Sequence, residues 1–132
     1  DLVMTKDNVL VARHDLYLST TTNVASKPEF AKRKRKTDDV AYEGRDDWWV
    51  EDFTLAEIKS LRAVQPFAGR TKVFDGLYQV PTFAEIVALV RAKSAESGRT
   101  VGLYPELKHP MFLLQQGIFD KKTYNYTYLA LM

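Results

Sequence analysis

The chain has 132 residues, of which 45% are hydrophobic and 27% are charged. This balance is typical of a globular domain with a buried core, and it excludes a disordered chain. The 19 basic and 17 acidic residues leave a formal net charge of +2, so no overall field favours nucleic acid or anionic lipid as a partner. The absence of cysteine excludes disulfide bonds, thiolate metal ligands and a cysteine nucleophile. No apolar run approaches the roughly 18 residues of a membrane span.

The first predicted elements are two short strands joined by a tight turn. Residues 2–5 and 9–13 are apolar, β-branched runs, and residues 6–8 between them include an Asp and an Asn. Asp and Asn tolerate turn geometry because their side chains bond to the nearby backbone. The segment 19–52 that follows shows no sustained hydrophobic period. We therefore predict a long inserted loop, of a length that is usually functional or mobile.

Two helices are predicted next, each beginning with a capping box, in which a Thr and the Glu three residues later bond to each other's backbone N–H. The first box, Thr54 with Glu57, predicts a helix of about two turns. The second, Thr82 with Glu85, predicts a longer helix that ends at Gly98. The apolar residues expected to lie buried along one side of the longer helix are Phe83, Ile86, Val87, Leu89 and Val90.

A brief β-rich run at 100–104 follows the second helix and stops at Pro105. The order of helix, glycine, short strand and polar residues is typical of an α/β protein with parallel strands. Tyr124, Tyr126 and Tyr128 alternate as in a strand and predict a further one near the end of the chain.

Two polar clusters lie where predicted strands end, which is where open α/β sheets and barrels present their ligands. The first is the sequence Arg-His-Asp around His14, whose imidazole can exchange a proton with a phosphate-ester oxygen near neutral pH. The second contains Glu106 and Lys108, which share one face of an extended stretch because they alternate about Leu107. Such a carboxylate and ammonium can hold a cation and a phosphate oxygen. A structural histidine and a surface ion pair are the alternatives, and both stay open.

Two further features, the basic run and a tryptophan pair, are interpreted as structural. The basic run 32–36 matches a nuclear-import or nucleic-acid patch, but acidic residues follow it closely and favour a solvated, self-neutralising loop. Trp48 and Trp49 either line a substrate entrance, where they would bind a choline-like cation over their rings, or anchor the loop on the body, which we favour. His109 is assigned no role. The acids that follow the basic run are Asp38, Asp39, Glu43, Asp46 and Asp47.

Three segments, in order and in approximate spacing, resemble the glycerophosphodiester phosphodiesterase family. They are DLVMTKDNVLVARHD at 1–15, DFTLAEIKSL at 52–61 and YPELK at 104–108. The likeness is greatest to the long-loop bacterial type. It implies an α/β fold that is part of a (β/α)8 TIM barrel of the phospholipase C-like phosphodiesterase type, with residues 1–132 as a partial domain and 19–52 as the inserted loop. The family hydrolyses glycerophosphodiesters to glycerol 3-phosphate and an alcohol.

The resemblance also implies the roles of four residues. Asp1 and Glu106 match metal-binding acids of the family, whose divalent cation is commonly Ca²⁺ or Mg²⁺. His14 matches one of two acid/base histidines, and Lys108 matches a lysine near the phosphate. This chemistry is coherent, because a hard cation held by carboxylates polarises the phosphoryl oxygens while two imidazoles exchange protons with the attacking and departing oxygens.

Two residues of the family's site are missing from the chain: the first histidine, in a His-Arg-Gly motif, and the glutamate two positions before Asp1. A closed barrel also needs about 250 residues. We therefore expect an internal piece of a larger periplasmic or secreted enzyme, inactive alone, with a small-molecule glycerophosphodiester as substrate and no nucleic acid as partner. The alternatives are a catalytically inactive barrel fragment that binds a ligand or partner, and a phospholipase D-like or phosphoinositide-cleaving barrel. The alcohol headgroup, the metal and the oligomeric state stay open.

Overall fold

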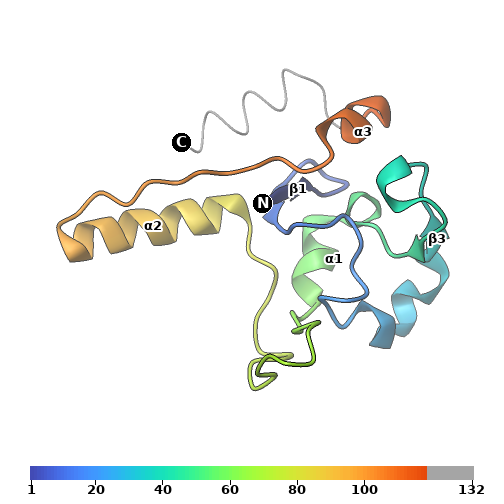
Figure 1. The fold of residues 1–132 in the computed structure, drawn as a ribbon, viewed down its shortest axis with the longest axis horizontal. Helices are drawn as coiled ribbons and strands as arrows, with labels where there is room; N and C mark the ends of the chain where they lie inside the picture. Colours follow the sequence, from blue (N-terminus) through green and yellow to red (C-terminus); the bar gives the residue numbers. More distant parts are fainter. Residues whose placement is uncertain (119–132) are drawn as a thin grey trace.

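The structure is a computed structural model, and it describes residues 1–118. Short strands and helices gather around one hydrophobic core, and the longest helix reaches away from them (Figure 1). Within the described residues, no helix combines the length and the apolar character that crossing a membrane requires. The strand predicted around residues 124–128 lies outside the described residues.

The N-terminal hairpin has the predicted form of strand, turn and returning strand. Strands β1 (Leu2–Met4) and β2 (Leu10–Ala12) pair antiparallel. In the turn, Asn8 adopts a left-handed φ of 63°, and its N–H donates to the carbonyl of Thr5 at 3.0 Å. Asn tolerates this conformation better than most residues do. The Thr5 hydroxyl donates to Asp7 Oδ1 at 2.7 Å, so the turn also holds itself through side chains.

A single parallel bridge, between Leu2 and Leu107, joins this hairpin to the chain beyond the longest helix. The N–H of Leu2 donates to the carbonyl of Glu106 at 2.8 Å, and the N–H of Lys108 donates to the carbonyl of Leu2 at 2.9 Å. Parallel pairing occurs at this bridge, whereas the two sheets in residues 1–118 are antiparallel, and the strand predicted at 100–104 is wrong. Because Leu107 pairs with Leu2 in a parallel register, residues 100–104 align with positions that precede β1. They therefore meet no strand among the described residues with which to pair.

Helices α1 (Leu55–Ser60) and α2 (Phe83–Ser97) begin at the two predicted capping boxes. In each box the threonine side chain accepts from the glutamate N–H, and the glutamate side chain accepts from the threonine N–H. α2 ends at Gly98, whose φ of 64° is the left-handed stop predicted for it. A further short helix, α3 (Pro110–Gln115), follows the bridge to the hairpin.

α2 buries less of its apolar side than predicted. Phe83 and Val87 are buried, but Ile86 and Val90 are half-buried and Leu89 is exposed. The N-terminal end of the helix packs against the hairpin, and the remainder extends away from it (Figure 1). Hydrophobic spacing predicts which side of a helix is apolar, whereas burial depends on what packs against it.

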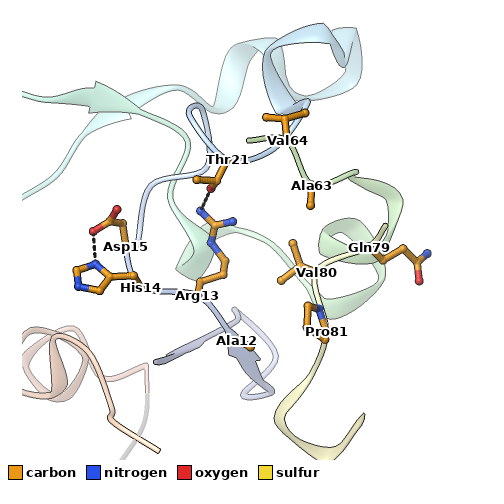
Figure 2. A pocket seen from close by; sticks show the side chains of 10 residues that line it. All are labelled: Ala12, Arg13, His14, Asp15, Thr21, Ala63, Val64, Gln79, Val80 and Pro81. Carbon is orange, nitrogen blue, oxygen red and sulfur yellow. Dashed lines mark hydrogen bonds and ion pairs between the residues drawn. The ribbon is translucent and has the colours of Figure 1, made fainter. Parts of the chain in front are cut away.

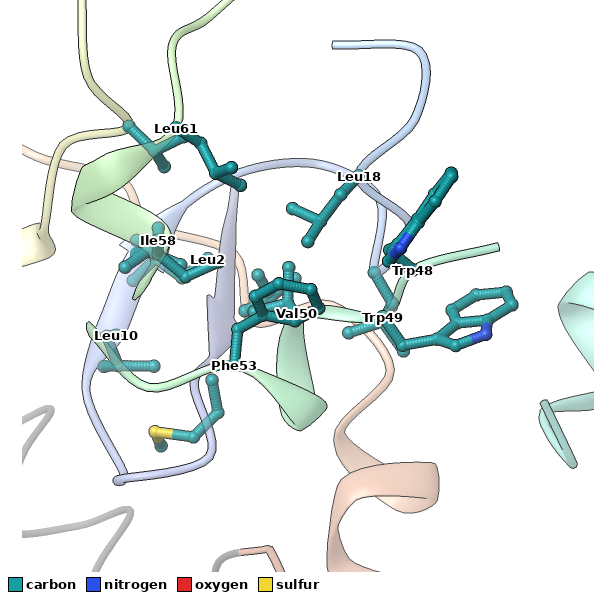
Figure 3. Close-up of a cluster of buried hydrophobic side chains, with 14 of the residues drawn as sticks. Leu2, Leu10, Leu18, Trp48, Trp49, Val50, Phe53, Ile58 and Leu61 are labelled. Carbon is teal, nitrogen blue, oxygen red and sulfur yellow. The ribbon is translucent and has the colours of Figure 1, made fainter. Parts of the chain in front are cut away.

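The segment 19–52 is irregular, as predicted, but it supplies much of the core. Figure 3 shows Trp49 and Val50 from this segment in the same cluster of buried side chains as Phe53 and Leu10. The boundaries of an inserted loop remain a prediction. Its short elements are the 3₁₀ helices η1 (Val24–Ser26), η2 (Pro28–Arg33), η3 (Val40–Tyr42) and η4 (Val50–Asp52), and the paired strands β3 (Arg35–Lys36) and β4 (Asp46–Asp47).

The tryptophan pair anchors this segment, which confirms the favoured interpretation. Trp48 is 9% exposed and Trp49 is fully buried. Their indole N–H groups donate to the carbonyls of Phe30 and Arg35, each at 2.7 Å. Each ring therefore combines apolar burial with a satisfied polar group, as buried tryptophans generally do.

The basic run is neutralised by ion pairs, but mostly with acids other than those predicted. Arg33 pairs with Glu57 at 2.6 Å, and Arg35 pairs with Asp52 at 2.7 Å. Asp46, at 3.6 Å from a lysine of the run, is the one predicted acid that pairs with it in the described part of the chain. Of the other predicted acids, Asp39 caps the short helix η3, and Asp47 accepts hydrogen bonds from Ser19 and Arg45 within the loop.

Glu51 is a buried acid next to this run. Its side chain is 3% exposed, and its Oε2 has no hydrogen-bond partner within the described residues. Burial raises the pKa of Glu51 to about 7, although Arg35 lies 3.3 Å from the other oxygen. The charged form is thus disfavoured in the folded protein relative to the unfolded chain.

Replacing Trp49 with Ala in the full-length protein is expected to lower the free energy of unfolding by about 3–5 kcal/mol, because a large buried side chain is lost. The exposed Phe67 provides a matched control, and Phe67→Ala should change the stability by about 0.5 kcal/mol or less. Urea unfolding monitored by circular dichroism measures both. Equal losses for the two variants would contradict the anchoring role.

Replacing Glu51 with Gln should stabilise the full-length protein in a pH-dependent way. A raised folded pKa means that ionisation of Glu51 costs stability as the pH rises from the unfolded value of 4.5 through about 7. The increase in Tm on Glu51→Gln should therefore be small near about pH 4 and largest above about pH 8. Thermal unfolding across this range tests it, and a benefit that does not grow with pH would show that Arg35 already compensates the charge.

Candidate functional site

His14 follows β2 and leaves the hairpin at an exposed position. Its side chain is 64% exposed, and its Nδ1 lies 2.8 Å from Asp15 Oδ1. Burial raises the pKa of Asp15, but hydrogen bonds from His14, Tyr17 and Tyr42 outweigh burial and lower the pKa below its usual value. Asp15 is therefore an ionised acceptor at neutral pH. An ionised acceptor at Nδ1 favours the proton on that nitrogen, and this leaves Nε2 of a neutral His14 free to accept a proton.

Asp1, Glu106 and Lys108 form a second group around one ammonium. The Nζ of Lys108 lies 2.8 Å from Glu106 Oε1 and 3.5 Å from Asp1 Oδ1. The hydrogen bond from Lys108 lowers the pKa of Glu106. The predicted alternation about Leu107 is confirmed, since both charged side chains lie on one side of the backbone. They flank the bridging residue, however, and do not end a strand as predicted.

The two groups meet at one end of the hairpin. Asp1 precedes β1 and His14 follows β2, and the antiparallel pairing brings these two ends together. The N–H of Arg13 donates to the carbonyl of Asp1 at 3.1 Å. Glu106 joins them across the parallel bridge, and the nearby His14 contributes, after Lys108, to lowering the pKa of Glu106. The structure thus brings all four predicted site residues to one edge, while their chemical roles remain predictions.

The carboxylates of Asp1 and Glu106 offer the oxygen ligands that Ca²⁺ and Mg²⁺ bind, but two are fewer than either cation requires. Within residues 1–118, no three side chains of His, Asp or Glu gather into a metal site. The donor chemistry fits a hard cation, and the number fits part of a ligand set. A complete site needs further oxygen ligands beside these two.

A cavity of about 270 Å³ opens beside the hairpin end and is lined by Arg13 and His14 (Figure 2). Arg13 is 9% exposed, and its guanidinium donates to the carbonyl of Tyr17 at 2.5 Å and to the hydroxyl of Thr21 at 2.8 Å. Burial lowers the pKa of Arg13 to about 10, so the side chain keeps its charge near neutral pH. Figure 2 shows Arg13 directed toward Thr21, whereas His14 turns toward Asp15.

Two residues near His14 were missed by the sequence analysis. The hydroxyl of Tyr42 lies 2.8 Å from His109 Nε2 and donates to Asp15 Oδ1 at 3.3 Å. Tyr42 is 27 residues from Asp15 and 67 from His109, so no local sequence pattern predicts either contact. The one signal in the sequence was that the chain has only two histidines. In the structure both are connected to Asp15, His14 directly and His109 through Tyr42.

The sequence matches the model of the glycerophosphoryl diester phosphodiesterase family over residues 1–124. A glycerophosphodiester phosphodiesterase of Arabidopsis thaliana is 39% identical over 116 residues, which cover 88% of this chain and 30% of that protein. A glycerophosphodiester phosphodiesterase of Haemophilus influenzae is 35% identical over an alignment of 128 positions, and the alignment covers 89% of this chain and 32% of that protein. The chain thus spans about a third of the length of these relatives.

The fold is similar to the crystal structure of a protein from Silicibacter pomeroyi named as a glycerophosphoryl diester phosphodiesterase. The TM-score is 0.62 at 22% identity, over 99% of this chain and 41% of the other. The predicted fold class, an α/β chain that is part of a TIM barrel, is confirmed by this likeness together with the family match. The resemblance of the three sequence segments is confirmed as well, and the chain belongs to the glycerophosphoryl diester phosphodiesterase family.

Proposed function

We propose that the protein containing this chain hydrolyses glycerophosphodiesters to glycerol 3-phosphate and an alcohol, with a divalent cation. Family membership supports the reaction class. The observation that carries the proposal is the meeting of His14 with Asp1, Glu106 and Lys108 at one end of the hairpin. A proton-exchanging imidazole, two carboxylates and an ammonium are groups that can take part in phosphodiester hydrolysis with a bound cation.

Asp1 and Glu106 would hold Ca²⁺ or Mg²⁺ together with oxygen ligands from outside this chain. When bound, the cation withdraws charge from the phosphoryl oxygens. Lys108 lies between the two carboxylates, where its ammonium can bind a phosphoryl oxygen and offset the negative charge that gathers during displacement. Glu106 is exposed, so its carboxylate is accessible to a cation and to the other ligands of that cation.

His14 would serve as an acid/base through its Nε2. Asp15 holds Nδ1, so the ring has one orientation and one nitrogen free for the attacking or departing oxygen. Proton removal and proton delivery need two groups if they occur on opposite sides of the phosphorus. The His-Arg-Gly motif that carries the family's other histidine is absent from these 132 residues, and we therefore expect them to be inactive alone.

The location and the alternative roles belong to the same proposal. The resemblance favours a periplasmic or secreted protein, which fractionation of the native cells tests directly.

If the barrel binds ligands without catalysis, neither the unmodified protein nor a variant at His14 will release glycerol 3-phosphate in a metal-dependent way. The alcohol headgroup is identified by comparing substrates that differ in that part alone.

Replacing His14 with Ala in the full-length protein is expected to lower kcat by about 100- to 10,000-fold, the range that general acid/base groups contribute. The side chain is exposed, so the fold should not change. Release of glycerol 3-phosphate from glycerophosphocholine measures kcat, and circular dichroism checks the fold. Turnover equal to that of the unmodified protein would remove the assigned role.

Replacing Glu106 with Gln should raise the Ca²⁺ or Mg²⁺ concentration needed for half-maximal activity by about 10-fold or more, because an anionic ligand is lost. Glu96 provides a matched control, since it is exposed at the far end of α2 and pairs with Lys93. Glu96→Gln should leave the metal titration unchanged. A titration that is the same for both variants would exclude Glu106 from the metal site.

A further inference from the structure

A continuous series of polar contacts leads from His14 into the segment 19–52, the long irregular segment. Asp15 Oδ1 lies 2.8 Å from His14 Nδ1 and accepts from the Tyr42 hydroxyl at 3.3 Å. The Tyr42 oxygen lies 2.8 Å from His109 Nε2. The other ring nitrogen, Nδ1 of His109, lies 2.8 Å from Asp39 Oδ2, as a close contact without the alignment of a hydrogen bond.

The donors along this series point consistently toward Asp15. Tyr42 has one hydroxyl proton, and it goes to Asp15. The contact between Tyr42 and His109 therefore requires a proton on Nε2 of His109. At the other end, Asp15 accepts on one oxygen from both Tyr42 and His14. Tyr42 thus limits where the carboxylate can turn, and the carboxylate in turn holds the ring of His14.

The contributing residues come from three separate parts of the chain. Asp39 caps η3 from the preceding position, where its Oδ1 accepts from the N–H of Ala41, and Tyr42 ends η3. His109 is the residue before α3, and its φ of 53° lies in the left-handed region that residues other than glycine seldom adopt. Such a conformation persists where the surroundings hold it, and it often marks a functional position.

Burial makes these polar contacts costly, so their number calls for an explanation. The side chain of Asp39 is 6% exposed and that of His109 is 19% exposed. The ring of Tyr42 packs against Tyr17, Trp49 and His109 at centroid distances of 5.5, 5.5 and 4.8 Å. These ring contacts alone would dock the segment. A buried network whose polar groups are hydrogen-bonded can select one geometry, which suits a series of contacts that sets an orientation.

We propose that Tyr42 and His109 are positioning residues for His14, acting through Asp15. The inference rests on the proposed acid/base role of His14 and extends the machinery around it to two residues that lie far from it in sequence. Asp39 holds the outer end of the series by its contact with His109. The long irregular segment thereby contributes to catalysis without touching the substrate.

The electrostatics of Tyr42 agree with this arrangement. Burial, followed by the negative charge of Asp15, raises the pKa of Tyr42 above its ordinary value. The hydroxyl therefore stays protonated at neutral pH and remains a donor to Asp15.

The test uses kinetics of the full-length protein with glycerophosphocholine and the metal. Tyr42→Phe removes the hydroxyl and keeps the ring contacts, and it should lower kcat roughly 10-fold while KM changes less than about twofold. His109→Leu should act similarly, whereas His109→Gln keeps an amide donor near the position of Nε2 and should restore kcat to within about threefold. Tyr78→Phe is the matched control, because Tyr78 is exposed and packs against Phe74.

A double-mutant cycle separates positioning from a structural role. In an Asp15→Asn background, Tyr42→Phe should lower kcat by less than about twofold, because the route to His14 is already broken. Losses that multiply in this cycle would overturn the proposal, as would a Tyr42→Phe variant with the kcat of the Tyr78→Phe control. If His14→Ala keeps full turnover, the proposed function and this inference both fail. If His14→Ala is inactive while Tyr42→Phe is unaffected, the positioning role alone fails.

Discussion

The arrangement of this site depends on two backbone hydrogen bonds, those that Leu2 makes with Glu106 and Lys108. Neither bond involves a side chain, yet together they define which residue of the later segment stands opposite Asp1. A shift of one residue would turn Glu106 and Lys108 to the opposite face and put Leu107 in their place. The parallel bridge is therefore the constraint that makes an ion pair and a candidate cation site out of residues more than a hundred positions apart.

The long irregular segment serves the same edge of the molecule from the other side. Its tryptophans and Val50 complete the core against which the hairpin packs. From this base η3 carries Tyr42 to the carboxylate beside His14. The segment 19–52, whose elements are all short, is thus held by burial at several points, and the close packing of its buried side chains keeps Tyr42 in place.

Local chemistry was predictable from the sequence, and long-range pairing was not. The capping boxes at Thr54 and Thr82 mark where α1 and α2 begin, since both partners lie within four residues of each other. The exposure of Leu89 was not foreseen, because it depends on what packs against the end of α2. The strand expected at 100–104 failed for a related reason: a β-rich run needs a neighbour in register.

The site shows the same division. The period of two along an extended chain predicts that Glu106 and Lys108 share a face, and they do. The roles of Asp1 and His14 came from family resemblance, because a lone acid or histidine carries little information. Tyr42 was not singled out and His109 was assigned no role, since their contact joins two segments whose packing no periodicity encodes.

The two buried indoles have a spectroscopic consequence. Both tryptophans of the chain lie in the long irregular segment, and the ring of Trp49 packs against that of Tyr42. If the segment detached from the core, both indoles would become hydrated and their emission would shift to longer wavelength, while α2 would contribute nothing to the change. The intrinsic fluorescence of this region therefore reports whether the segment that carries Tyr42 is packed on the core, and it does so without a label, a substrate or a metal.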